Sequence, residues 1–187
     1  RHKTHTLQRG DWKWFAWLGF LGVAMNQTGF TVGIHYTTVG HASLIFGMGP
    51  ILVLILAVGM KLESLTLRKT LGLTLSFIGA AFLASEHGLT TKNPTLIGDL
   101  IIVGGVVAFS LYTTFGKKVG GRYDTLTFTT FTYIAGALVV TPMASWQLFE
   151  TDWAAVTWRG WLGAAYMAGI ASVAAYMIFY CALTKIS

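Results

Sequence analysis

The sequence has 187 residues, of which 54% are hydrophobic and only 11% are charged, and its formal net charge is +6. Soluble domains carry roughly 25% charged residues, so this composition excludes an ordinary soluble protein, and the high hydrophobicity excludes a disordered chain. The single cysteine, Cys181, excludes an intramolecular disulfide and any zinc site built from several cysteines. The positive charges form short clusters between long apolar runs, which indicates a membrane protein and not a nucleic-acid-binding one.

Six apolar segments follow one another along the chain. A helix that crosses a bilayer needs about 20 apolar residues, and the stretch between Trp14 and Met60, which has no Asp, Glu, Lys or Arg, is long enough for two. We place the turn between them at 36–40, where small, polar and β-branched residues cluster. The six expected helices cover residues 14–35, 41–60, 71–85, 96–115, 125–145 and 160–183.

The basic residues indicate the orientation of these helices. Lysine and arginine accumulate in the cytoplasmic segments of membrane proteins. With six alternating helices, 11 of the 13 lysines and arginines lie on one side, and only Lys92 and Arg159 lie on the other. We therefore expect the N-terminal tail, the segments 61–70 and 116–124, and the end at residue 187 to be cytoplasmic.

A short motif repeats along the chain and predicts the architecture. Trp-Phe-Ala-Trp-Leu-Gly begins at Trp14, and Trp-Arg-Gly-Trp-Leu-Gly begins 144 positions later at Trp158. The two helices are five spans apart and would cross in opposite directions, as in the inverted repeats of many secondary transporters. Two five-helix repeats would make ten helices. We therefore expect 1–86 to be the C-terminal part of a first repeat and 87–187 the N-terminal part of a second, each with three helices.

Further motifs follow in a fixed order and point to a family. They are Tyr36-Thr37-Thr38, Ala42, Pro50 in mid-helix, Glu63, Gly72, Gly79, Gly98-Asp99, Tyr112, Trp161-Leu162-Gly163, Ala175-Tyr176 and Tyr180-Cys181-Ala182-Leu183. In this order and spacing the sequence resembles the EamA-type permeases of the drug/metabolite transporter (DMT) superfamily. The resemblance implies an all-α polytopic membrane protein with six transmembrane helices, the third to eighth of an inverted-repeat ten-helix fold. It also implies export or exchange of small metabolites through a central cavity, in the inner membrane of a bacterial cell.

The helix expected at 41–60 contains a candidate hinge. Pro50 cannot donate a hydrogen bond to the carbonyl of Phe46, and Gly47 and Gly49 lie beside it. Broken helices often line the binding sites of transporters, because the freed backbone groups can face the cavity. The alternative is a tolerated kink without a functional role, since proline and glycine are common in membrane helices.

Neutral polar side chains within the helices are candidates for contact with a solute. An amide or hydroxyl is costly in hydrocarbon unless it has a partner, and a solute in a mostly apolar cavity is one such partner. Ordinary packing, hydrogen bonds between helices and a position at the membrane interface remain open as alternatives. The candidates are Asn26, Gln27, Tyr36, His41, Ser43, Tyr112, Tyr133, Ser172 and Tyr176.

Two function classes remain open. No Asp, Glu, Lys or Arg falls inside an expected span, and the sequence has neither a catalytic carboxylate pair nor a metal-ligand cluster. This favours a secondary transporter of amino-acid-like or drug-like solutes, working by alternating access, over a membrane enzyme or a structural membrane subunit. We expect no cofactor, no metal and no nucleic-acid partner. The expected partners are the lipid bilayer, a small-molecule substrate and flanking helices of a longer chain, and a homodimer is left open.

Overall fold

The computed structural model describes residues 8, 10–86, 96–150 and 152–186, and every regular element within them is a helix. The elements are α1 (Trp12–Gly19), the π-helix η1 (Phe20–Met25), α2 (Asn26–Gly33), α3 (Val39–Gly47), α4 (Gly49–Gly59), α5 (Leu67–Glu86), α6 (Leu96–Gly120), α7 (Thr125–Glu150), the short 3-10 helix η2 (Trp153–Ala155), α8 (Trp158–Tyr166), the π-helix η3 (Met167–Ala174) and α9 (Ala175–Ile186). We call the continuous run α1–η1–α2 the first helix and the run α8–η3–α9 the last helix.

The membrane assignment is confirmed. Four helical stretches in the described part of the chain are long and apolar enough to cross a bilayer, namely Val39–Gly59, Leu96–Gly120, Thr125–Ser145 and Trp158–Phe179. Each contains the roughly 20 residues that the hydrocarbon core requires. The protein is therefore an all-α polytopic membrane protein, and its helices follow the six expected segments in order.

Several helices extend beyond the segments that hydrophobicity predicts. α5 begins at Leu67 and not at residue 71, because the Thr66 hydroxyl accepts a hydrogen bond from the backbone N–H of Lys69 at 3.5 Å. α6 continues to Gly120 and α7 to Glu150, each five residues past its expected end. Apolarity marks the part of a helix inside the bilayer, whereas backbone hydrogen bonding continues through the polar residues beyond it. The loop expected at 86–95 lies mostly outside the described residues.

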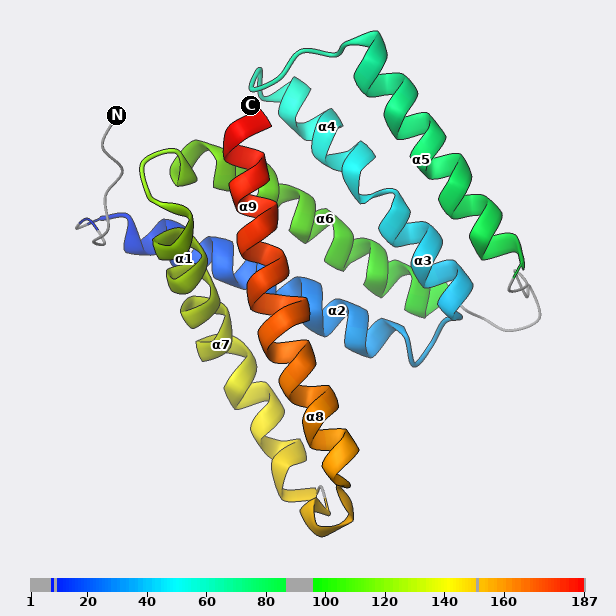
Figure 1. Ribbon diagram of the computed structural model, residues 1–187, viewed down its shortest axis with the longest axis vertical. Helices are drawn as coiled ribbons and strands as arrows, with labels where there is room; N and C mark the ends of the chain where they lie inside the picture. The colour runs from blue at the N-terminus through cyan, green and yellow to red at the C-terminus, as the bar shows by residue number, and fades with distance from the viewer. Residues whose placement is uncertain (1–7, 9, 87–95, 151, 187) are drawn as a thin grey trace.

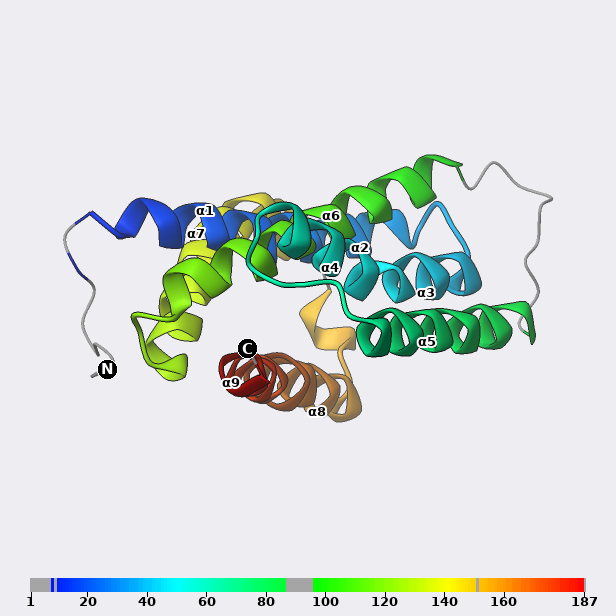
Figure 2. The same ribbon diagram turned by 90° about the horizontal axis from the view of Figure 1, so that it is seen from above.

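α6 is the central helix of the bundle. It packs against the first helix, α3 and α4, and one buried apolar cluster lies on each of these sides. The larger cluster joins Phe15, Leu18 and Tyr112 to Phe128 of α7. The smaller one joins Ile102 and Val106 to α3 and α4. Figure 2 shows α5 and the last helix on the same side of this core.

The first helix approaches α6 and α7 so closely that side chains are excluded at the contact points. A Cβ atom on Gly98 would lie 2.7 Å from the carbonyl oxygen of Gly33, and one on Gly136 would lie 2.4 Å from the Cβ of Val23. Small residues permit such backbone contact between membrane helices. A Cβ on Gly72 of α5, by contrast, would have no neighbour within 4 Å among the residues that the structure describes.

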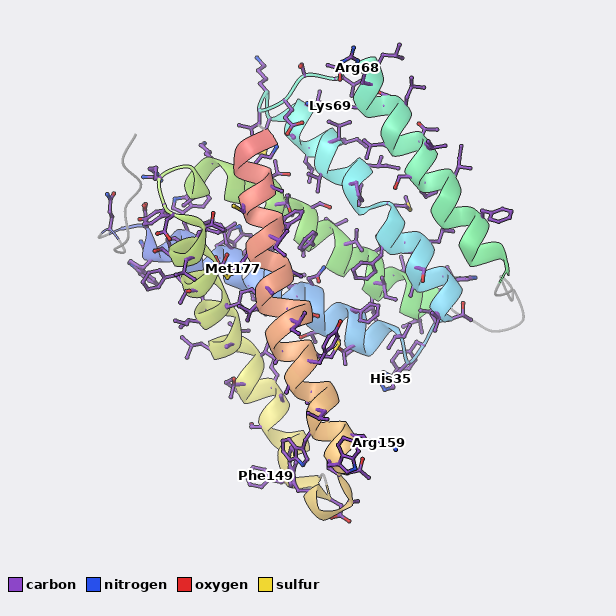
Figure 3. The ribbon with its side chains drawn as sticks, in the orientation of Figure 1. His35, Arg68, Lys69, Phe149, Arg159 and Met177 are labelled. Atoms are coloured by element: carbon purple, nitrogen blue, oxygen red, sulfur yellow. The ribbon has the colours of Figure 1, made fainter. Side chains whose placement is uncertain are left out.

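The chain passes between two ends of the molecule, as Figure 1 shows. The linker between α4 and α5, the turn between α6 and α7, and the end of α9 lie at one end. The turn between α2 and α3 and the connection from α7 to α8 lie at the other. Arg68 and Lys69 lie at the first end and His35 and Arg159 at the second (Figure 3), so the charge asymmetry in the sequence corresponds to two separate ends in space.

The first and last helices run in opposite directions between these ends, as an inverted repeat requires. Both also contain a π-helical segment in their middle. The 144-residue offset of the tryptophan motif places the segment Phe20–Met25 at 164–169, which overlaps Met167–Ala174. The repeat and its boundary near residue 86 remain predictions, and this shared irregularity is a structural reason to keep them.

Candidate functional site

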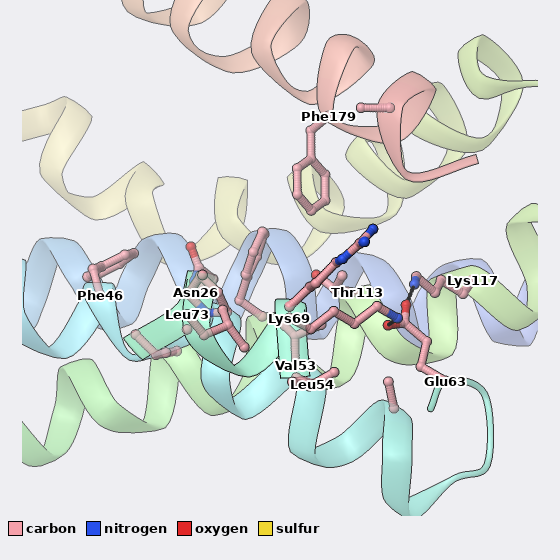
Figure 4. A pocket seen from close by; sticks show the side chains of 18 residues that line it. Asn26, Phe46, Val53, Leu54, Glu63, Lys69, Leu73, Thr113, Lys117 and Phe179 are labelled. Atoms are coloured by element: carbon pink, nitrogen blue, oxygen red, sulfur yellow. Dashed lines mark hydrogen bonds and ion pairs between the residues drawn. The ribbon is translucent and has the colours of Figure 1, made fainter. Parts of the chain in front are cut away.

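A cavity of about 820 Å³ lies beside α6, between the first helix, α3, α4, α5 and α9 (Figure 4). This volume lies within the range of small-molecule sites. Most of the wall is apolar, and the charged side chains lie toward one end. The residues that line the cavity are Asn26, Phe46, Gly49, Pro50, Val53, Leu54, Ala57, Glu63, Arg68, Lys69, Gly72, Leu73, Val106, Phe109, Thr113, Lys117, Phe179 and Ala182.

The helix break that the sequence predicts forms part of this wall. α3 ends at Gly47 and α4 begins at Gly49, with Met48 between them. Pro50 lies in the first turn of α4, where a backbone N–H would have no partner within the helix. Gly49 and Pro50 face the cavity and Gly47 lies just outside it. That the break moves during transport stays a prediction.

The middle of the cavity is apolar with two polar groups. The rings of Phe109 on α6 and Phe179 on α9 approach to 6.1 Å between centroids, which brings the last helix to the cavity. Asn26 uses its amide Nδ2 to donate to the carbonyl of Gly105 at 3.1 Å. Thr113 Oγ1 is buried and has no hydrogen-bond partner among the residues that the structure describes. The oxygen itself is not accessible from the cavity, because less than 1 Å² of its surface is exposed.

A cluster of charged residues closes the cavity toward the basic end of the molecule. The Glu63 carboxylate forms ion pairs with Lys117 and with Lys69, the second at 2.9 Å. The Lys117 side chain is 14% exposed and that of Glu63 is 20% exposed, so this contact is largely shielded from water. The hydrogen bonds donated by Lys117 and Lys69 hold the pKa of Glu63 below its usual range. Glu63 therefore stays ionised at neutral pH.

A second polar cluster fixes the opposite end of α6. Thr37 Oγ1 donates to Asp99 Oδ1, and His41 Nδ1 lies 3.0 Å from Asp99 Oδ2. Asp99 lies in the first turn of α6, where the helix dipole favours a carboxylate. The cluster joins the turn between α2 and α3 to α6, and it is separate from the cavity.

The candidate residues from the sequence fall into different environments. Asn26, Gly49 and Pro50 line the cavity, and Tyr112 is buried between the first helix and α6, where its ring packs on Gly22. His41 belongs to the Asp99 cluster. Gln27, Tyr36 and Ser43 are exposed, Tyr133 on α7 and Ser172 on the last helix are half-buried, and Tyr176 lies in α9 with its side chain outside the described set.

Sequence reasoning missed the charged lining residues. It treated Glu63, Lys69 and Lys117 as parts of surface loops, but α6 extends far enough for Lys117 to meet Glu63 across 54 positions of sequence. A signal was available in α5, because Arg68 and Lys69 lie in its first turn. The positive end of the helix dipole disfavours cations there, and such a violation of a local rule often marks a functional site.

The sequence profile of the EamA-like transporter family matches residues 1–85 and 96–187 of this chain. The chain belongs to this family. Among curated relatives, the uncharacterized transporter YyaM of Bacillus subtilis strain 168 is 29% identical over 162 residues, which cover 86% of this chain and 53% of YyaM. An uncharacterized transporter of Archaeoglobus fulgidus is 27% identical over 178 residues, which cover 94% of this chain and 60% of the relative.

The EamA-family chain spans about half the length of the curated relatives it matches. No solved structure matches it. Membership of a transporter family agrees with the cavity between its helices. Within the described residues no group of three or more His, Cys, Asp or Glu side chains is positioned to hold a metal ion.

Proposed function

We propose that this protein is a secondary transporter that moves small amino-acid-like or drug-like solutes by alternating access, in export or exchange. The observation that carries the proposal is the cavity of about 820 Å³ beside the broken helix α3–α4. A carrier needs a solute site enclosed by helices that can rearrange, and transporter sites commonly form at discontinuous helices. The family membership supports membrane transport as the activity.

The two ends of α6 suggest where rearrangement would occur. At one end the carboxylate of Asp99 pairs with His41 of α3, and at the other Lys117 pairs with Glu63 on the linker that follows α4. The first pair joins α6 to α3, and the second joins α6 to the linker that follows α4. Moving α3 away from α6 would separate the first pair and moving the linker would separate the second, so one pair can open while the other holds.

A cavity-filling substitution tests the proposal. Val53 of α4 lines the cavity, whereas Ile55, two residues along the same helix, is 58% exposed and lies outside the cavity wall. In the complete transporter, reconstituted in lipid vesicles, Val53→Trp should abolish counterflow of a transported solute because the indole ring occupies the solute site. Ile55→Trp should transport normally. Normal counterflow by a folded Val53→Trp variant would refute the proposed site.

The orientation is a further part of the proposal. The end that carries Lys69 and Lys118 faces the cytoplasm of a bacterial cell, because lysine-rich segments are retained on that side. An impermeant thiol reagent applied to intact cells tests this with single cysteines in a Cys181→Ser background. Tyr36→Cys, in the exposed turn at the other end, should be labelled, and Lys118→Cys should not. The reverse pattern would overturn the orientation.

A further inference from the structure

The charges around the cavity do not balance. Of the described residues that line it, Arg68, Lys69 and Lys117 are cations, and Glu63 is the one anion. Glu63 is shared between Lys69 and Lys117, and Arg68 makes no ion pair with any residue that the structure describes. Arg68 and Lys69 are exposed where they border the cavity, whereas the Lys117 side chain is only 14% exposed. The cavity therefore has a surplus of positive charge at one end.

The backbone adds to this positive potential. Arg68 and Lys69 lie in the first turn of α5, a helix of 20 residues, and that turn contains no acidic residue. The unsatisfied N–H groups at a helix N-terminus carry roughly half a positive elementary charge, which favours anions. Retention of lysine and arginine on the cytoplasmic side explains a basic linker. It does not explain why three cations from α5 and α6 converge on one cavity.

Beyond this end, the cavity offers little to a highly polar solute. The aromatic rings of Phe46, Phe109 and Phe179 line it, together with aliphatic side chains of α4. Asn26 and Thr113 are the polar residues of the wall outside the charged cluster. A polyol or a nucleotide would lose hydrogen bonds to water here without replacing them.

We propose that the solute is an organic carboxylate with an apolar body. Its carboxylate binds Arg68, Lys69 and Lys117, and its body lies against the three phenylalanine rings. The inference rests on the proposed function and names the substrate class of the same cavity. Glu63 acts as the resident counterion that the solute displaces. Because Glu63 lies on the linker after α4 and Lys117 lies on α6, displacement would release the linker from α6.

Removing a cation from the cluster and removing its anion should change carboxylate binding in opposite directions. Arg68→Gln should weaken binding of a carboxylate about tenfold, the factor that corresponds to ~1.4 kcal/mol. Glu63→Gln should strengthen it, because the variant removes the competing carboxylate. If the cluster only stabilised the fold, both variants would lose affinity or neither would change. Lys118→Gln, which removes a cation from the exposed surface of α6 at the same end, is the matched control and should have no effect.

The experiment is equilibrium binding to the complete transporter in detergent, with 3-phenylpropanoate, 4-methylpentanoate, 3-phenylpropanamide and 3-phenylpropylamine as probes. We expect the two carboxylates to bind, the amide and the amine to bind at least about tenfold more weakly, and the variants to move carboxylate affinity in opposite directions. Equal binding of all four probes, absence of carboxylate binding, or a loss of affinity in Glu63→Gln would overturn the inference. Binding without counterflow in vesicles would contradict the transport proposal instead, so the two failures are distinguishable.

Discussion

Two adjacent stripes of α6 have different environments. One stripe, with Gly98, Gly105 and Tyr112 at seven-residue intervals, packs against the first helix. The neighbouring stripe, which includes Phe109, Thr113 and Lys117, faces the cavity. Along the first stripe the backbones are so close that a Cβ on Gly98 would overlap the chain between Gly33 and Thr37. Along the second, open volume separates α6 from α5 and α9.

We therefore expect the packed stripe of α6 to matter mainly for stability and the cavity stripe to matter mainly for solute binding. Close backbone contact gains van der Waals energy only if no side chain intervenes, so Gly98 on the packed stripe cannot gain a side chain without moving a neighbouring segment. The cavity stripe borders open volume, so substitutions there should affect what binds more than they affect the fold. Variants on each stripe can break or sharpen this comparison.

The largest effect on stability is expected at Gly98. Gly98→Ala should destabilise the protein by about 1–3 kcal/mol, because its Cβ would lie 2.6–2.7 Å from backbone atoms of the turn after α2. Gly104→Ala is the control on the same helix, since a Cβ there would meet nothing within 4 Å. It should be neutral or stabilising by up to ~1 kcal/mol. Thermal unfolding in detergent measures both, and equal melting temperatures would refute the close contact.

Pro50→Ala should change transport and not stability. The substitution restores a backbone N–H and raises helix propensity, so α3 and α4 should join into one stiffer helix. We expect turnover in vesicles to fall several-fold while the melting temperature is unchanged or higher. A variant with unchanged turnover would show that the break at Met48 is a tolerated kink, and a destabilised variant would assign Pro50 to packing.

Two neighbouring buried threonines of α6 differ in the hydrogen bonding of their hydroxyl groups. Thr113 forms part of the cavity wall, but its Oγ1 is buried and has no hydrogen-bond partner among the described residues, whereas Thr114 Oγ1 donates to the carbonyl of Ser110 at 2.8 Å. Thr113→Val should leave stability unchanged or raise it by about 1 kcal/mol, because it removes a buried hydroxyl without a partner. Thr114→Val should lower stability slightly and leave binding unchanged. Exchanged effects on stability, measured by thermal unfolding in detergent, would mean that the two hydroxyl environments are assigned wrongly.

The smallest expected effect is the pH dependence of stability at the charged cluster. The pKa of Glu63 is lower in the folded protein than the usual value of 4.5, because Lys117 and Lys69 donate hydrogen bonds to its carboxylate. The ion pairs therefore stabilise the fold above pH 4.5, and this contribution is lost as the pH falls through the lowered pKa. The melting temperature of the parent protein should fall more between pH 6 and pH 3 than that of Glu63→Gln. Parallel curves would show that the pairs contribute nothing.

Hydrophobicity and charge were sufficient to predict the elements. The spans, the break near Pro50 and the division of basic residues between two ends depend on local composition, so they could be read from the chain. The helix ends were predicted less well, since α5, α6 and α7 continue through polar residues that hydrophobicity alone assigns to loops.

The candidate site was predicted only in part. Asn26, Gly49 and Pro50 line the cavity. They could be chosen as candidates because polar, glycine and proline residues inside a membrane span are visible in the sequence. Tyr36 and Tyr112 show the limit of this reasoning. They are the same residue type, yet one lies exposed in a turn and the other is buried against Gly22. Residue type does not reveal which face of a helix meets a neighbour.

By itself the sequence determined that this chain forms apolar helices, that one of them breaks beside Pro50, and that its basic residues gather at one end. These properties depend on the free energy of transferring each side chain into lipid and on the hydrogen bonding of each backbone group, which are set by the individual residue. Only the tertiary structure decided that Lys117 meets Glu63, and that Gly98 and Gly105 of α6 fall on one stripe and its cavity residues on another. A helix in a bilayer is largely apolar on all its faces, so hydrophobicity does not specify how one helix is rotated about its axis relative to its neighbours. Close packing and the pairing of distant polar groups fix that rotation.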